Sequence, residues 1–226
     1  MKNTILLLIS LLFLTGCMEE KEVTSLQDRG GVKYEINSEV GFTGKYVEFY
    51  KDGQKKVEEH LELGKRHGFY FGWYENGQEK FKQRYYKNGQ KEWEENYKNG
   101  KLDGLSTKWY ENGQKSEEYN YKNGKIEGLS TTWYMYGQKM SESNWKNGRM
   151  NGLSTYWYPN EQKWTEGHYK NGFLKYDGIW TKWYMNGQKE EEVTWKDDKK
   201  EGLSTFWDKE GNVTKTETYK DGELVK

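Results

Sequence analysis

The chain has 226 residues, of which 33% are hydrophobic, 17% aromatic and 32% charged. So few aliphatic side chains exclude a thick two-layer core, and so many aromatic ones exclude a disordered chain. Lys and Arg together number 36, as do Asp and Glu, so the overall charge gives no basis for binding nucleic acid or anionic lipid.

The first sixteen residues resemble a bacterial export signal. Lys2 precedes an apolar run over residues 5–14, which is too short to span a bilayer as a mature helix. Residues 14–17, Leu-Thr-Gly-Cys, resemble the lipobox of bacterial lipoproteins, which implies cleavage before Cys17 and lipid on its sulfur. Cys17 is the only cysteine, which excludes an internal disulfide. We expect an exported protein that is lipid-anchored to the cell envelope, at the outer membrane in a two-membrane bacterium.

Residues 17–31 follow as the lipidated cysteine and a tether, because they mix both charges and contain Gly30-Gly31 without a clear pattern. Glu19 and Glu20 are a weak indication of a signal for display on the cell surface. An ordinary signal peptide with a chance cysteine is the alternative.

From residue 32 to residue 226 the chain is a tandem repeat with a step of about 24 residues. Asn-Gly and Asp-Gly pairs separate short runs that alternate aromatic or β-branched residues with polar ones, the pattern of β-hairpins. Consecutive turn glycines are alternately 11 and 13 residues apart, as in Gly113, Gly124, Gly137 and Gly148. We therefore predict an all-β fold: an elongated, twisted, single-layer antiparallel meander of tandem β-hairpins, with roughly sixteen strands.

Two breaks interrupt the repeat. A copy and a half separates Gly68 from Gly104, because residues 84–90 add one strand and one turn. We expect this single added strand to move all later Gln-Lys turns to the opposite edge of the sheet. The second break covers residues 159–180, where Pro159, the only proline, opens a turn without a glycine.

Two aromatic series recur at neighbouring slots of the repeat. Neighbouring strand residues point to opposite faces, so the two series should form ladders on opposite faces. The simpler interpretation is packing between strands, and the alternative is an aromatic face left open as a stacking platform. The tryptophan series is Trp73, Trp109, Trp133, Trp157, Trp183 and Trp207, and the tyrosine series is Tyr74, Tyr110, Tyr134, Tyr158 and Tyr184.

The repeat as a whole, W-Y-x-N-G-Q-K followed by a Glu-rich strand and Y-K-N-G-K-x-x-G, resembles the MORN repeat variant family. Residues 109–115 with 121–128, and residues 133–139 with 145–152, carry the resemblance, which extends over about residues 44–226. It implies a MORN-like β-hairpin array and an antitoxin or immunity-like protein that neutralises a toxin by binding it. The family supplies no catalytic residues to carry over.

Nothing in the sequence indicates an enzyme, a metal or a cofactor. His60, His67 and His168 are scattered over separate repeats without the spacing of zinc ligands. Acidic pairs recur in most repeats, whereas a catalytic pair needs a unique pocket. We predict a non-catalytic protein.

The predicted function is therefore a lipid-anchored module that binds or scaffolds a protein partner, a toxin or an envelope protein. We expect contact at Pro159, His168, Phe173 and Tyr176 in the second break, and along the tyrosine series. The alternative is a surface protein that binds cell-wall glycan (peptidoglycan) through exposed Trp and Tyr rows. Neither nucleic acid nor a small-molecule ligand is expected.

Overall fold

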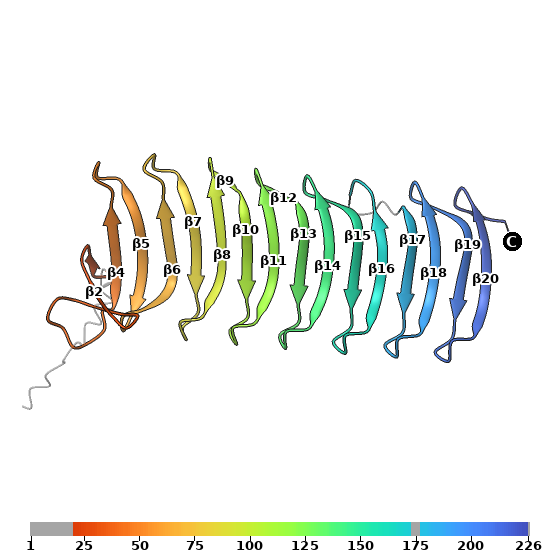
Figure 1. Cartoon of the computed structure of the whole chain (residues 1–226), viewed down its shortest axis with the longest axis horizontal. Helices are drawn as coiled ribbons and strands as arrows, with labels where there is room; N and C mark the ends of the chain where they lie inside the picture. The colour runs from red at the N-terminus through yellow and green to blue at the C-terminus, as the bar shows by residue number, and fades with distance from the viewer. Residues whose placement is uncertain (1–19, 173–176, 226) are drawn as a thin grey trace, which may run out of the picture.

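The computed structural model describes residues 20–172 and 177–225, and every regular element in this part of the chain is a β-strand (Figure 1). Nineteen strands form one sheet, and β2 (Gln27–Arg29) and β3 (Val32–Tyr34) form a separate hairpin. The strands of the large sheet stand side by side in a single row from one end of the molecule to the other (Figure 1). The predicted all-β, single-layer meander is confirmed.

The row begins at β4, and the short β1 lies against it. In chain order the strands of the large sheet are β1 (Glu22–Val23), β4 (Gly44–Phe49), β5 (Lys55–Glu62), β6 (Lys65–Trp73), β7 (Glu79–Tyr85), β8 (Lys91–Lys98), β9 (Lys101–Leu102), β10 (Gly104–Trp109), β11 (Lys115–Lys122), β12 (Lys125–Ile126), β13 (Gly128–Trp133), β14 (Lys139–Lys146), β15 (Arg149–Trp157), β16 (Lys163–Tyr169), β17 (Gly178–Trp183), β18 (Lys189–Lys196), β19 (Lys199–Trp207), β20 (Val213–Lys220) and β21 (Glu223–Leu224). The pairs from β4 onward are antiparallel, and β1 pairs with β4 in parallel.

The Gln-Lys turns share one main-chain geometry. In the β10–β11 hairpin the amide of Tyr110 donates to the carbonyl of Gln114 (2.8 Å), and the amide of Gly113 donates to the carbonyl of Tyr110 (2.9 Å). Gly113 has a φ of 84°, which glycine adopts without the steric cost that other residues meet. Glu161 fills this slot in the β15–β16 turn with a φ of 66°, and its amide donates to Tyr158 at 2.9 Å. The turn that lacks a glycine therefore keeps the shape of the others.

The inserted strand, β8, moves the Gln-Lys turns from one edge of the sheet to the other. In Figure 1 the β4–β5 and β6–β7 turns lie along the upper edge, whereas the β7–β8 and β10–β11 turns lie along the lower edge. The later hairpins β13–β14, β15–β16, β17–β18 and β19–β20 also turn at the lower edge. The edge change predicted from the added strand is confirmed.

The same insertion also exchanges the faces. Residues paired across antiparallel strands project from the same face of a sheet. Glu58 pairs with Phe71, Phe71 with Lys82, and Lys82 with Glu95, so Glu58 and Glu95 share a face. Glu94 must then lie on the other face. Glu58 and Glu94 nevertheless hold equivalent slots, since each forms an ion pair with the lysine three residues before it. The repeat is thus rotated by half a turn about the long axis of the sheet.

Beyond β8, one face carries a central row in which threonine and glutamate alternate across the strands. Thr107 pairs with Glu94 on one side and Glu118 on the other, and it is only 4% exposed. The row continues through Thr131, Glu142, Thr155, Glu166, Thr181, Glu192 and Thr205. We call the face that carries this row the Thr–Glu face.

The reverse face buries small side chains beneath half-exposed rings. Ser130, Ser143, Ser154 and Ser204 are all buried, and the indole nitrogen of Trp145 donates to Ser130 Oγ at 2.7 Å. We expected the rings themselves to form the core, but in the described residues the fully covered positions are mostly Ser and Thr. A single layer explains this, because no second layer covers the outer side of a large ring.

The N-terminal end of the array is the exception, because a segment folds back over it. The hairpin β2–β3 packs there, with the amide of Lys33 donating to the carbonyl of Gly64 at 2.9 Å. Phe42, Val47 and Leu61 are at most 4% exposed beside it. Part of the predicted tether, residues 20–31, therefore contains strands that belong to this cap. Residues 1–19, and with them the predicted signal and Cys17, lie outside the described residues.

The described residues contain no helix that is long and apolar enough to cross a membrane.

Candidate functional site

The lower edge is built from turns that are fastened to one another by tyrosine hydroxyls. The hydroxyl of Tyr110 donates to the carbonyl of Trp133 (2.8 Å), and that of Tyr134 donates to the carbonyl of Trp157 (2.8 Å). Tyr158 and Tyr184 make the equivalent bonds to Trp183 and Trp207, at 3.1 and 2.9 Å. Each phenol therefore ties one repeat to the next.

Asparagines add a second link between the same turns. The side-chain amide of Asn112 donates to the carbonyl of Met135 (2.7 Å), and that of Asn160 donates to the carbonyl of Met185 (2.9 Å). The carbonyl oxygen of each asparagine also accepts the amide of the glutamine two residues on, as in Gln114 (3.0 Å). The turns thus form a continuous hydrogen-bonded ladder that holds their outward side chains in fixed positions.

Two turns of this ladder, β13–β14 and β17–β18, display large apolar side chains to solvent. Tyr136 is 77% exposed, Met185 58% and Met135 50%. At the start of β16 and β14, Trp164 and Met140 are also exposed. We call these five residues the apolar lower edge.

The same slots carry polar residues in the neighbouring repeats. The slot of Met135 and Met185 holds Glu111 in the preceding repeat and Lys209 in the last one. The slot of Tyr136 holds Asn112. The apolar residues are therefore not required by the turn, and they are confined to the hairpins from β13 to β18.

A hollow on the reverse face adjoins this edge. It has a volume of about 640 Å³, and Trp93, Tyr110, Tyr119 and Met140 contribute to its lining. Burial raises the pKa of Tyr119 above its ordinary value, as does the nearby carboxylate of Glu117. The hollow therefore combines aromatic side chains with charged ones, since Glu92, Lys108 and Glu117 line it as well, and Met140 lies at its border.

The tryptophan rings lie under lysine ammonium groups. Lys91 Nζ is 5.4 Å from the centre of the Trp109 ring, and Lys115 Nζ is 5.7 Å from that of Trp133. Each lysine also bonds the glutamate three residues on. The same arrangement recurs at Lys55 with Trp73, Lys139 with Trp157, Lys163 with Trp183 and Lys189 with Trp207. A cation thus occupies one side of each ring in this series.

The structure distributes the predicted contact residues over the molecule. Tyr74 lies at the upper edge, where its hydroxyl donates to the carbonyl of Tyr97 at 3.2 Å, away from the other four members of its series. Pro159 is exposed in the β15–β16 turn, within the apolar lower edge region, and His168 is exposed opposite Leu153. Phe173 and Tyr176 lie outside the described residues.

Sequence reasoning missed the apolar lower edge, although the signal was present. Met135, Tyr136, Met140 and Met185 interrupt slots that are polar in other copies, and Trp164 does so at the slot of Ser116. The tyrosine series drew attention because it recurs, yet recurrence marks the residues that hold the repeats together. A slot-by-slot search for deviations would have found the exposed residues.

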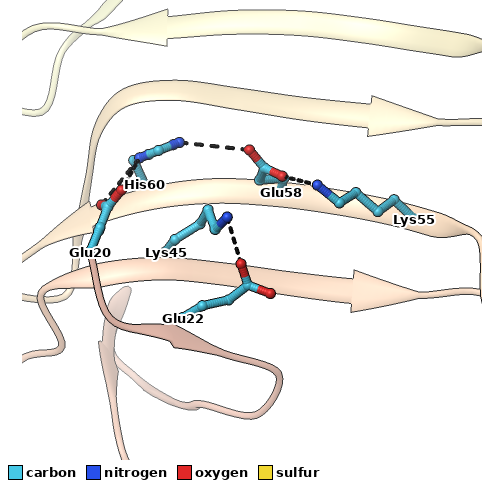
Figure 2. A network of polar contacts seen from close by, with 6 residues as sticks. All are labelled: Glu20, Glu22, Lys45, Lys55, Glu58 and His60. Atoms are coloured by element: carbon cyan, nitrogen blue, oxygen red, sulfur yellow. Dashed lines mark hydrogen bonds and ion pairs between the residues drawn. The ribbon is translucent and has the colours of Figure 1, made fainter.

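A second polar cluster lies at the N-terminal end, on the face that carries Glu58 (Figure 2). His60 Nδ1 is 3.1 Å from Glu20 Oε2, and Lys45 Nζ is 2.5 Å from Glu22 Oε2. Glu58 bonds Lys55 at 2.5 Å in the same group. These contacts fasten residues 20–23 to β4 and β5, so the cluster has a structural role in the cap.

No group of His, Cys, Asp and Glu side chains within residues 20–172 and 177–225 is arranged to hold a metal ion.

The comparisons with known proteins agree with the repeat pattern. Four segments match the MORN repeat variant family, at residues 102–123, 150–171, 176–197 and 200–221. A search of curated proteins found no match to the chain. The segment at residues 150–171 includes Trp164 and the segment at residues 176–197 includes Met185, whereas Met135, Tyr136 and Met140 lie between matched segments.

Proposed function

We propose that the protein is a non-catalytic binding module whose apolar lower edge docks a protein partner. One observation carries the proposal: Met135, Tyr136 and Met185 are at least half exposed in slots where most other repeats place charged or amide side chains. Large apolar side chains exposed along one edge are typical of protein interaction sites. The MORN repeat segments, which commonly mediate protein or membrane binding, support a binding role.

The composition of the edge suits a protein partner. Tyrosine and tryptophan are enriched among the residues that carry most binding energy, and methionine adapts its shape to irregular partner surfaces. Their turns are held by the tyrosine and asparagine bonds described above, so little main-chain ordering would accompany binding. The adjoining hollow beside Met140 offers a pocket for a side chain of the partner.

In its most specific form, the proposal is that this chain is a lipid-anchored envelope protein that neutralises a toxin by binding it. The lipobox at Cys17 supports the anchor, and the resemblance to the repeat variant family supports the toxin as partner. Incorporation of radiolabelled palmitate should depend on Cys17, so that the Cys17→Ser variant takes up none. Co-expression with the product of a neighbouring toxin gene should restore growth, and the substitutions described next should abolish that rescue.

Site-specific photo-crosslinking tests the docking edge in living cells. A benzoylphenylalanine at Tyr136 should form a discrete, protease-sensitive adduct, whereas the same probe at Asn112, the equivalent slot of the preceding repeat, should form none. Changing Met135 to Glu and Met185 to Lys in the Tyr136 probe protein should remove the adduct. The fold should persist, because Glu111 and Lys209 already occupy these slots elsewhere. Equal crosslinking from Tyr136 and Asn112 would contradict the proposal.

Glycan binding through aromatic rows has less support. Lysines lie over the tryptophan series, and the tyrosine hydroxyls bond the main chain of the next repeat. We expect labelled peptidoglycan not to be retained by the immobilised protein.

A further inference from the structure

The upper edge of the middle repeats carries a cation at one end of each of six strands: β8, β9, β11, β12, β14 and β15. Lys98 and Lys101 pair directly across the β8–β9 turn, Lys122 and Lys125 across the β11–β12 turn, and Lys146 and Arg149 across the β14–β15 turn. All six side chains are exposed. We call them the basic upper edge.

These pairs are unfavourable for the isolated protein. Like charges directly opposite each other on neighbouring strands destabilise a sheet. Other tight pairs of the array, such as Lys108 with Glu117 at 2.9 Å, place opposite charges together. Such pairs follow one another in three successive turns of the middle repeats, and Lys196 with Lys199 forms one more across the β18–β19 turn.

The carboxylates nearest to these cations are engaged elsewhere. Asp103 Oδ2 accepts the amide of Asn123 (3.1 Å), and Glu127 Oε2 accepts the amide of Asn147 (2.8 Å). Within residues 20–172 and 177–225, no ion pair involves any of the six cations. Arg149 makes one contact of 3.4 Å, to the carbonyl of Asn171.

The cations also border a hollow on this edge. It has a volume of about 440 Å³, and it is lined by three lysines, one carboxylate and two amides: Lys101, Lys122, Lys125, Glu127, Asn123 and Asn147. The stems of two of these lysines pack under the next turn, since a Cβ on Gly124 would lie 3.9 Å from Lys101 Cβ, and one on Gly148 would lie 3.6 Å from Lys125 Cβ. The first side-chain carbons of Lys101 and Lys125 therefore lie against the next turn.

The structure assigns to the basic upper edge the binding of a linear, phosphate-bearing polyanion. The cations form a line, with neighbouring strands about 4.8 Å apart, which suits a polymer with regularly spaced charges. Lysine binds phosphate as a point charge, and release of counterions from a polyanion favours the association.

A flat anionic membrane suits the edge less well. It would meet the whole upper edge, whose two ends carry acidic residues beside basic ones: Asp52 and Glu75 with Lys51 at one end, and Asp197 and Asp221 with Lys196, Lys199 and Lys220 at the other. A linear polymer can occupy the basic stretch alone. This assignment is independent of the apolar lower edge, which lies along the opposite edge of the sheet (Figure 1).

Fluorescence anisotropy with end-labelled inorganic polyphosphate tests the assignment on the full-length chain. We expect the logarithm of affinity to fall with the logarithm of salt concentration with a slope of about −4, as expected for six cations on a single-stranded polyanion. The K101Q/K122Q/K125Q variant keeps the side-chain stems, and it should bind at least about tenfold more weakly with a slope of about −2.

Matched controls separate this site from general charge effects. The K65Q/K87Q/K209Q variant removes the same number of exposed charges from turns at the lower edge, and its affinity should match that of the unmodified chain. Three results would overturn the assignment: equal losses in both triple variants, equal binding of orthophosphate at the same phosphate concentration, or binding to phosphatidylserine vesicles without binding to polyphosphate.

Discussion

The hairpins before and after β8 carry the same repeat in opposite orientations. The β4–β5 and β6–β7 hairpins turn at the upper edge, and all Gln-Lys turns from β7–β8 onward lie at the lower edge (Figure 1). A single added strand thus separates two regions that one sequence pattern would otherwise make alike. As a result, each edge carries Gln-Lys turns in one region and the shorter turns of the repeat in the other. Equivalent exposed residues of the two regions therefore lie at opposite edges.

The two regions also differ in how they are held together. The N-terminal region is capped by β2–β3 and contains Glu59, which is fully buried and bonds both Lys33 and Arg66. No such cap covers the described residues of the later region, whose stability comes from bonds between neighbouring repeats, as in other linear repeat proteins. We infer that the capped region is the fixed end of the array and that the later repeats provide its binding surfaces.

The largest expected effect concerns the buried carboxylate of the capped region. Glu59→Ala leaves two partly buried cations without their partner, which should lower the free energy of unfolding by about 3 kcal/mol. Glu118→Ala is the matched change in the later region, where the carboxylate is partly exposed and the loss should be at most about 1 kcal/mol. Urea denaturation of both variants gives the comparison. Equal losses would show that the cap does not distinguish the regions.

A smaller effect concerns the tyrosine ladder of the later region. Tyr134→Phe removes the hydroxyl bond to the carbonyl of Trp157, which should cost about 1 kcal/mol. Tyr136→Phe in the same turn should cost nothing measurable, because that side chain is 77% exposed. In the Tyr134→Phe variant, amide hydrogen exchange should be faster in the two hairpins that this hydroxyl bond joins. An equal effect at Tyr136 would contradict the structural role of the series.

The smallest effect is a loss of stability at alkaline pH. Burial raises the pKa of Tyr70 in the capped region and of Tyr119 and Tyr121 in the later one. The folded state therefore holds the phenolic protons more tightly than the unfolded state does. This stabilisation is complete below the ordinary tyrosine pKa of 10.0 and is lost as the pH rises through the raised values. Ultraviolet titration at 295 nm should show that these tyrosines ionise at a higher pH in the folded protein than in urea.

The periodic part of the fold was predictable because the residues of each repeat specify its turns and strands locally. Asn-Gly turns such as Asn112-Gly113 determine where the hairpins end, and the extra turn at Gly89 determines the change of edge. The cap was not predictable, since residues 20–34 carry no repeat and their contacts, such as Lys33 with Glu59, join segments far apart in sequence. The apolar lower edge was present in the sequence as deviations from the repeat at Met135, Tyr136 and Met185. Their shared position at one edge, however, depends on the change of edge at β8.

The change of edge at β8 is tested most directly by electron–electron distances between spin labels on three turns. Lys51 and Glu75 lie on turns of the upper edge, and Glu111 lies on a turn of the lower edge. With Cys17 replaced by Ser, we expect labels at Glu75 and Glu111 to be roughly 30 Å apart, because a full strand length separates the two edges. Labels at Lys51 and Glu75 should be about 10 Å apart, two strand spacings along one edge. A separation of about 14 Å between Glu75 and Glu111, three strand spacings on a single edge, would contradict the account.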